Sequence, residues 1–422
     1  MARGRRVSEL LNKEAAMNRR SFLATAGMTP FAMSSVGRTT EAESTPDQSP
    51  PYPLPNGYEP WLEIKKDALT WNVEQLSKNA GGKPVLAVLK DHAYGHGIVG
   101  VARHFESVDV VHGYAVVKIQ SAIDLAESGV RKPIVLLGPT TDFELEYVVQ
   151  HNIIPAVYTD RSDLLVKLAA KYNRPMKIHF YVDTGMGRVG VPYYQAMPVV
   201  EALAAHNEIV FDGTLTELTE DDDFDPEQIR RFNDLYEQAN QKGIELGVRH
   251  AASSGGIFHV PVAHLDMVRP GISLYGCFPD DEAEKSRSIP LRTTFNFKTR
   301  VMYVKQIRQG DSLQYGRNYI AEKPTWIATL PVGHADGWPR QTANNCNVLI
   351  NGRQYPVVAT LSANHCLVEL GDEKTAEMGD EVLLIGETED QGLTAHAVAS
   401  KTGVGVYTLL MHLNSWLPRR YI

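Results

Sequence analysis

The spacing of apolar residues over 84–292 predicts short β-rich runs that alternate with helices. The clearest predicted helices cover 226–242, with Asp225 as N-cap, and 119–128, which stops at Gly129. The predicted strands are 85–90, 114–117, 133–138, 154–158, 177–183, 211–218, 248–254 and 267–276. Eight strands alternating with helices over about 200 residues are typical of a TIM barrel. A doubly wound sheet would require a Gly-rich turn after its first strand, and none is present.

The pattern changes after residue 291. Short β-branched runs follow one another, separated by Gly, Asp or Asn turns, which is typical of an all-β domain. We therefore predict an α/β fold, a (β/α)8 TIM barrel over 58–292 followed by a C-terminal all-β domain over 293–422.

The N-terminal 57 residues differ from the rest of the chain. The twin-arginine pair Arg19-Arg20 precedes an apolar run over 22–36, and a linker rich in Pro, Ser and Thr follows. This order predicts a removable export signal and a periplasmic or exported protein, starting at Met1 or Met17. The alternative is an unstructured tail with a chance arginine pair, on a cytoplasmic protein.

Composition narrows the function classes. A net charge of −8 argues against a nucleic-acid-binding protein, which needs a basic surface. No run reaches the roughly 18–20 apolar residues that span a bilayer. Cys277, Cys346 and Cys366 form no CxxC pair or zinc spacing, and an odd number of cysteines does not pair completely within one chain. We expect buried or incidental thiols.

Candidate chemistry lies at the predicted strand ends, where TIM barrels place their active sites. Lys90 ends the first strand, Ser254 with two glycines ends the seventh, and Arg269 and Gly271 lie in the eighth. A lysine facing a phosphate cradle is what pyridoxal 5'-phosphate (PLP) requires, because the lysine forms an imine and the phosphate anchors the ring. By position alone, however, a lysine that ends a strand is more often a solvated surface charge than a catalytic residue.

The sequence around Lys90 favours a PLP-binding lysine over a surface charge. Residues 87–97, AVLKDHAYGHG, resemble the AVxKAxAYGHG signature of alanine racemases, which are fold-type III PLP enzymes. Further matches follow in the family's order from Trp61: WLEI (61–64), VDTGMGRVG (182–190), DMVRPGISLYG (266–276), the Tyr-Gly pair at 315–316, LPVGHADGWPR (330–340) and VYTLLMHLNSWLPRRY (406–421). The family has a TIM barrel followed by a β-domain, the architecture that the apolar pattern predicts.

The resemblance implies the catalytic residues. Lys90 would hold PLP and act as base on one face of the substrate α-carbon, and Tyr315 would act on the opposite face. In this family the tyrosine reaches the active site of the other subunit, so a homodimer is implied. Both side chains have ordinary pKa values near 10, which must be lowered for a base to work at neutral pH.

The resemblance also implies the contacts to cofactor and substrate. Arg188 matches the arginine that binds the cofactor's phenolic oxygen and helps hold the substrate carboxylate. Arg269 matches the arginine facing the pyridine nitrogen, where a permanently charged donor disfavours ring protonation and should suppress transamination. The positions that match phosphate anchors are Tyr94, Ser254, Gly271, Ile272 and Tyr407.

Several positions depart from the family pattern. Glu217 stands where the family usually has a histidine, Ser253 where an asparagine is common, and Tyr181 where many members have a lysine that becomes carbamylated. His334 replaces a tyrosine on the approach to the site. Ala363-Asn364 replaces a Met-Asp pair that contacts the substrate carboxylate and closes the pocket.

The change at Ala363 and Asn364 bears on the substrate. With asparagine at this position, the chain resembles the broad-specificity amino-acid racemases, which are periplasmic. The loss of the larger methionine side chain at Ala363 should also widen the pocket. We therefore expect a racemase acting on small-molecule amino acids that include alanine and extend beyond it.

Three alternatives are weighed against a racemase. A PLP-binding homologue with altered or lost activity, for example a decarboxylase, is kept open by Glu217, because a carboxylate near the cofactor could change ring electronics. A non-catalytic PLP protein would have a single barrel without the β-domain and Tyr315. A metal site at His92 and His96 is disfavoured, because this segment is predicted to be a strand-to-helix turn with structural or cofactor-adjacent histidines.

Overall fold

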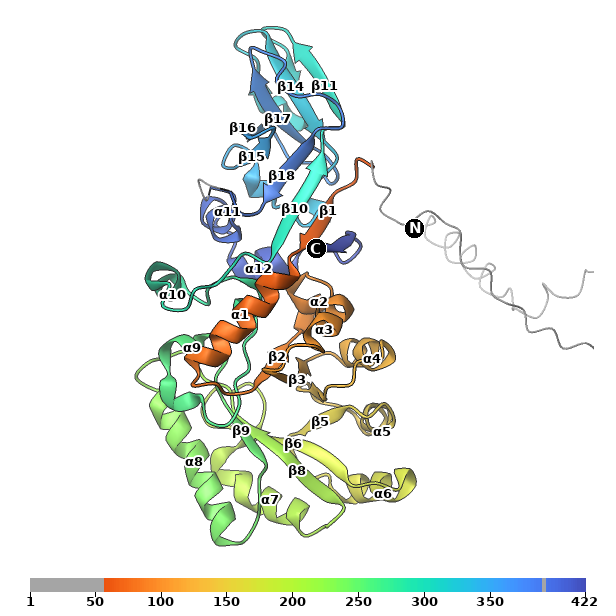
Figure 1. Cartoon of the computed structure of the whole chain (residues 1–422), viewed down its shortest axis with the longest axis vertical. Helices are drawn as coiled ribbons and strands as arrows, with labels where there is room; N and C mark the ends of the chain where they lie inside the picture. The colour runs from red at the N-terminus through yellow and green to blue at the C-terminus, as the bar shows by residue number, and fades with distance from the viewer. Residues whose placement is uncertain (1–56, 389–391) are drawn as a thin grey trace, which may run out of the picture. The chain divides into compact units, whose positions relative to one another are not determined.

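The computed structural model describes residues 57–388 and 392–422 (Figure 1). The predicted export signal and almost all of the linker lie outside these residues. Within the described ranges, none of the helices combines the length and apolar character needed to cross a membrane.

A parallel sheet forms the barrel, in the order β2-β3-β4-β5-β6-β8-β9. Its strands are β2 (Val85–Val88), β3 (Val111–Val116), β4 (Ile134–Leu136), β5 (Ile154–Val157), β6 (Met176–Asp183), β8 (Ile209–Leu215) and β9 (Val248–His250), and the short β7 (Val191–Pro192) pairs with the end of β6. β2 and β5 are buried along their whole length, as expected for parallel strands covered on both faces.

The eighth predicted strand is reduced to a bridge. Val268 pairs with Val85, and the N–H of Leu86 donates to Val268 O over 2.9 Å. The expectation of a strand over 267–276 was wrong beyond this point, because Pro270 has no N–H to donate and residues 272–275 turn into a short 3-10 helix. The bridge nevertheless closes the ring of strands.

Helices connect the strands on the outside of the barrel: α1 (Lys66–Asn79), α3 (Ile98–Phe105), α4 (Ile119–Glu127), α5 (Asp142–Gln150), α6 (Ser162–Tyr172), α7 (Ala196–Ala204), α8 (Asp225–Gln241) and α9 (Ser254–His259). The helix predicted over 226–242 is confirmed as α8, and its buried face includes Ile229, Phe232, Leu235 and Ala239. Its N-cap is Phe224 instead of Asp225, whose carboxylate accepts from the N–H of Thr219 over 3.1 Å. The predicted end of α4 at Gly129, with φ 79°, is confirmed.

The C-terminal domain contains a nine-stranded sheet in the order β11-β14-β17-β16-β15-β18-β10-β1-β19. Its strands are β1 (Trp61–Ile64), β10 (Phe295–Arg300), β11 (Tyr303–Ile307), β14 (Thr325–Leu330), β15 (Asn347–Ile350), β16 (Arg353–Val358), β17 (Cys366–Gly371), β18 (Glu381–Ile385) and β19 (Arg419–Tyr421), and β12 (Ser312–Leu313) with β13 (Tyr319–Ile320) forms a separate hairpin. The predicted fold class is confirmed.

The two ends of the described chain meet in this second sheet. β1 pairs antiparallel with β10 and parallel with β19, so the chain contributes one strand here before it builds the barrel. Two short helices, α11 (Ala395–Thr402) and α12 (Val406–Met411), lie among the last strands, and α10 (Asp281–Ser286) lies in the connection from the barrel. All three cysteines are buried and free.

Candidate active site

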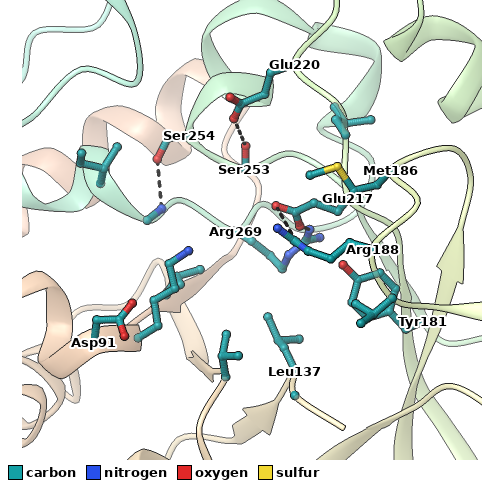
Figure 2. A pocket seen from close by; sticks show the side chains of 18 of the residues that line it. Asp91, Leu137, Tyr181, Met186, Arg188, Glu217, Glu220, Ser253, Ser254 and Arg269 are labelled. Carbon is teal, nitrogen blue, oxygen red and sulfur yellow. Dashed lines mark hydrogen bonds and ion pairs between the residues drawn. The ribbon is translucent and has the colours of Figure 1, made fainter. Parts of the chain in front are cut away.

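A cavity of about 580 Å³ lies at the carboxyl ends of the barrel strands (Figure 2). Every residue predicted to contact the cofactor lines it: Lys90, Tyr94, Arg188, Ser254, Arg269, Gly271, Ile272 and Tyr407. Tyr407 comes from α12, so the C-terminal domain of the same chain supplies part of the wall. These residues come from widely separated parts of the sequence and meet here because parallel strands end on one side of a barrel.

Lys90 begins a left-handed turn, α2 (Lys90–Tyr94), directly after β2. Asp91, His92, Ala93 and Tyr94 all have φ between 50° and 58°, a region that L-residues rarely occupy. Each such residue costs on the order of 1 kcal/mol, so the surrounding packing must hold the turn. The turn places Lys90 and Tyr94 on one wall, with the Lys90 Nζ 5.7 Å from the Tyr94 ring centroid.

Ser254 and Gly271 form a cradle suited to an anion. The Ser254 Oγ accepts from the N–H groups of Gly271 over 3.0 Å and Ser273 over 3.3 Å. A Cβ on Gly271 would lie 2.4 Å from the Tyr94 hydroxyl, so only glycine lets this hydroxyl approach the backbone. The Tyr94 ring packs 4.9 Å from Tyr275 and 6.4 Å from Tyr407, measured between ring centroids.

Arg269 is 2% exposed and extensively hydrogen-bonded. Its Nη1 donates to His250 O over 2.6 Å and to His250 Nδ1 over 3.0 Å. Its Nη2 donates to Thr216 O over 2.8 Å, to Ala251 O over 3.2 Å and to Glu217 Oε2 over 2.8 Å. Among the described residues the Nε–H has no acceptor, so it is the donor left for a ligand.

A buried histidine pair continues inward from Arg269. His250 Nε2 lies 2.8 Å from His179 Nδ1, and His179 Nε2 lies 3.7 Å from Asp212 Oδ2. Burial, and then the charge of Arg269, hold the pKa of His250 well below its usual value. His250 is therefore neutral, accepts from Arg269 at Nδ1 and donates to His179 from Nε2.

Glu217 links the two arginines of the cavity. Its Oε1 lies 3.9 Å from Arg188 Nη2, while its Oε2 accepts from Arg269. Figure 2 shows the Tyr181 hydroxyl next to Arg188. Burial opposes the charge on Arg188, but the contacts with Tyr181 and Glu217 outweigh it and raise the pKa of Arg188.

The remaining predicted site residues lie elsewhere. Tyr315, His334, Ala363 and Asn364 line a separate hollow of about 510 Å³ on the C-terminal domain, hereafter the Tyr315 hollow. The Tyr315 side chain is 77% exposed, and His334 Nε2 accepts from Arg340 over 2.7 Å. Within one chain these residues do not reach the cavity of Lys90.

His96 has a structural role. It is fully buried, its Nδ1 lies 3.0 Å from Tyr94 O, and its Nε2 lies 2.8 Å from the Thr294 hydroxyl. The described part of the chain contains no cluster of three or more His, Cys, Asp or Glu side chains suited to a metal ion.

Several cavity residues escaped prediction from the sequence. Tyr158, Leu137 and Met186 line the cavity, as does Glu220, whose carboxylate accepts from the Ser253 hydroxyl over 3.4 Å. Leu137 and Tyr158 lie at the ends of the predicted strands 133–138 and 154–158, one position after the observed β4 and β5, and that placement was the available signal. Glu220 gave no such signal, because it lies in the irregular loop after β8.

Comparison with known proteins agrees with this geometry. Residues 64–279 match the model of the alanine racemase N-terminal domain, and residues 294–421 match that of the alanine racemase C-terminal domain. The chain belongs to the alanine racemase family.

Individual relatives extend over most of the chain. Alanine racemase 1 of Clostridium acetobutylicum is 31% identical over 86% of this chain and 95% of its own length. The structure of an alanine racemase from Clostridium difficile 630 superimposes with a TM-score of 0.79 at 29% identity, covering 86% of this chain and 95% of that one. That of the Bartonella henselae alanine racemase, with covalently bound pyridoxal phosphate, gives 0.73 at 26% identity, covering 86% and 99%.

These relatives support a PLP-dependent racemase, an isomerase, and confirm PLP as the predicted cofactor. The cavity fits it. Lys90 supplies an amine on one wall. The Ser254 hydroxyl, whose oxygen accepts from the N–H groups of Gly271 and Ser273, supplies a donor for a phosphate, and the free Nε–H of Arg269 supplies a donor for a ring nitrogen.

Proposed function

We propose that this protein racemises several amino acids, alanine among them, as a homodimer in which the partner subunit's Tyr315 completes the active site. One observation carries the proposal. Lys90, Arg188 and Arg269 surround one cavity, whereas Tyr315 is 77% exposed in a separate hollow of the same chain. Racemisation by two bases needs proton-transferring groups on both faces of the α-carbon, and the separation of Tyr315 from Lys90 supports a second subunit as the source of the second group.

In this proposal, separate residues bind the cofactor, move the α-proton and bind the substrate. Bound PLP would withdraw electrons from the substrate and so acidify its α-proton. Lys90 would hold the cofactor and move the proton on one face, and Tyr315 from the partner subunit would move it on the other. Arg188, which lines the cavity and whose side chain is 58% exposed, would hold the substrate carboxylate.

The proposed substrate range is supported by Ala363 and Asn364. Both are exposed in the Tyr315 hollow, and they replace a larger methionine and a charged aspartate in the family pattern. If this hollow faces the partner's cavity, the smaller alanine side chain leaves room for longer substrates, and the neutral amide does not repel a carboxylate.

Racemisation assays over a panel of L-amino acids test the proposal, with the loss of optical activity as the readout. We expect turnover of alanine together with lysine, arginine, methionine, serine or glutamine. Turnover of alanine alone would contradict the broad range. Release of CO2 in place of racemisation would indicate a decarboxylase.

A mixing experiment tests the shared site. Lys90→Ala and Tyr315→Phe chains are each expected to be almost inactive. Co-refolded at equal amounts they should regain activity, because half of the mixed dimers' sites then carry neither substitution. No recovery, with mixed dimers verified by differential tags, would contradict sharing between subunits.

We further propose that the protein is exported by a twin-arginine signal, which transports folded proteins and suits an enzyme loaded with cofactor before export. Replacing Arg19 and Arg20 by lysine should retain the enzyme in the cytoplasm, as measured by fractionation of the expressing cells. Unchanged fractionation would contradict this location.

A further inference from the structure

A buried positive charge, that of Arg269, lies at the inner end of the cavity and requires a counter-charge. The Arg269 guanidinium is 2% exposed, and a buried cation without a counter-charge is strongly destabilising. Its partners include three backbone carbonyls and His250, which burial and Arg269 keep neutral. Among the described residues, Glu217 is the one carboxylate within hydrogen-bond distance of Arg269.

Glu217 also contacts the second arginine. Its Oε2 lies 2.8 Å from Arg269 Nη2, and its Oε1 lies 3.9 Å from Arg188 Nη2. Figure 2 shows the Glu217 side chain beside both arginines. The Glu217 side chain is 25% exposed, so solvent screens this pair only in part. The carboxylate therefore links the ring-nitrogen end of the proposed site to the substrate-carboxylate end.

The charge of Glu217 influences its neighbours in the cavity. Burial, and then the charge of Glu217, raise the pKa of both Tyr181 and Glu220. A histidine at this position, as the resemblance implies for the family, would be neutral or positive and would leave Arg269 without a counter-charge.

We propose that Glu217 is a positioning residue that neutralises Arg269 and ties it to Arg188, so that the ring-nitrogen end of the cofactor faces an ion pair instead of an uncompensated cation. The inference depends on the proposed function, because it concerns PLP held on Lys90. It assigns to this chain a charge balance around the cofactor that its other cavity residues do not supply.

The consequence concerns proton binding by the cofactor held on Lys90. A less positive surrounding favours the protonated form, so removing the Glu217 charge should shift the pH midpoint of the cofactor's visible absorption band downward. The other titratable or charged groups that line the cavity stay the same in such a comparison: Asp91, Tyr94, Lys118, Tyr158, Tyr181, Arg188, Glu220, Arg269 and Tyr407.

The experiment is a pH titration of the visible absorption of PLP-loaded wild type, Glu217→Gln, Glu217→Asp and the control Glu201→Gln. Glutamine keeps the size and an acceptor for Arg269 but loses the charge, and aspartate keeps the charge on a shorter chain. Glu201 is exposed on α7 and forms an ion pair with Lys242.

We expect the midpoint of Glu217→Gln to fall by about 0.5–1 pH unit, and those of Glu217→Asp and Glu201→Gln to stay within about 0.3 unit of wild type. The apparent KM of Glu217→Gln for the amino-acid substrate should rise as well, because Arg188 loses its ion pair with Glu217.

Two results would overturn the inference alone. One is a wild-type band with an unshifted midpoint in Glu217→Gln, and the other is an equal shift in Glu217→Asp, which would indicate packing instead of charge. A wild-type protein without any visible band in the presence of PLP would overturn both this inference and the proposed function, so the two failures are distinguishable.

Discussion

The barrel cavity and the Tyr315 hollow are built in opposite ways. The cavity collects side chains from several strand ends, and its inner wall is buried and hydrogen-bonded down to Arg269, which is 2% exposed. The hollow lies on one domain, and Tyr315, Ala363 and Asn364 are all exposed in it. A buried, hydrogen-bonded network holds a cofactor in one geometry, whereas an exposed tyrosine is oriented only when another surface covers it. We therefore expect the cavity to hold the cofactor and the reacting groups, and the Tyr315 hollow to be covered by a partner subunit.

Removing Lys90 tests the cavity most directly. Lys90→Ala should abolish the visible absorption of bound PLP and lower racemisation by about 10³-fold or more, because both the covalent attachment and one proton-transferring group are lost. Absorption spectra and optical rotation measure the two effects. Lys167→Ala on the exposed face of α6 is the control and should match wild type. A variant that kept its visible band would show that another residue holds the cofactor.

Removing the Tyr315 hydroxyl tests the hollow. Tyr315→Phe should keep the visible band and lose about 10²- to 10³-fold in racemisation. The loss in kcat/KM must be the same in both directions, because the two enantiomers have the same free energy, but exchange of the α-proton with solvent should be lost unequally for the two enantiomers. Deuterium exchange at the α-carbon from D2O, followed for each enantiomer, separates the two faces. Tyr303→Phe, an exposed tyrosine on β11 of the same domain, should have no effect. Equal losses of α-deuterium exchange for both enantiomers would contradict a two-base arrangement.

Restoring the family's methionine and aspartate at positions 363 and 364 tests whether the Tyr315 hollow determines substrate specificity. Ala363→Met combined with Asn364→Asp should lower kcat/KM for lysine relative to alanine by about 10- to 100-fold, the usual effect of reshaping a substrate pocket. Since both positions are exposed, the melting temperature should stay near that of wild type. An unchanged ratio would mean that the hollow does not face substrate.

A methyl group in the phosphate cradle should have the smallest effect. Gly271→Ala would place a Cβ 2.4 Å from the Tyr94 hydroxyl and should weaken PLP binding by about tenfold, as measured by absorption titration. Gly405→Ala, with no atom within 4 Å of its Cβ and a φ of −55°, is the matched control. Equal PLP affinity in both variants would indicate that the cradle tolerates the methyl group.

The apolar pattern predicted most of the fold. It gave seven of the eight barrel strands and the buried face of α8, because apolar periodicity reports directly which side of an element is covered. It failed where backbone chemistry overrides the pattern. Pro270 interrupts the eighth strand, and Thr219 draws the Asp225 carboxylate away from the N-cap. The left-handed turn after Lys90 gave no signal in residue type, since none of its members from Asp91 to Tyr94 is glycine.

The sequence by itself determined the motifs, and with them the residues that surround the cavity and the family to which the chain belongs. Only the tertiary structure decided how those residues combine. Glu217 and Arg269 are far apart in sequence, and their ion pair exists because the ends of β8 and of the strand bridge at Val268 converge on one side of the barrel. The structure likewise separated Tyr315 from Lys90, because a side chain's distance from a site depends on how domains pack and not on the motif that contains it.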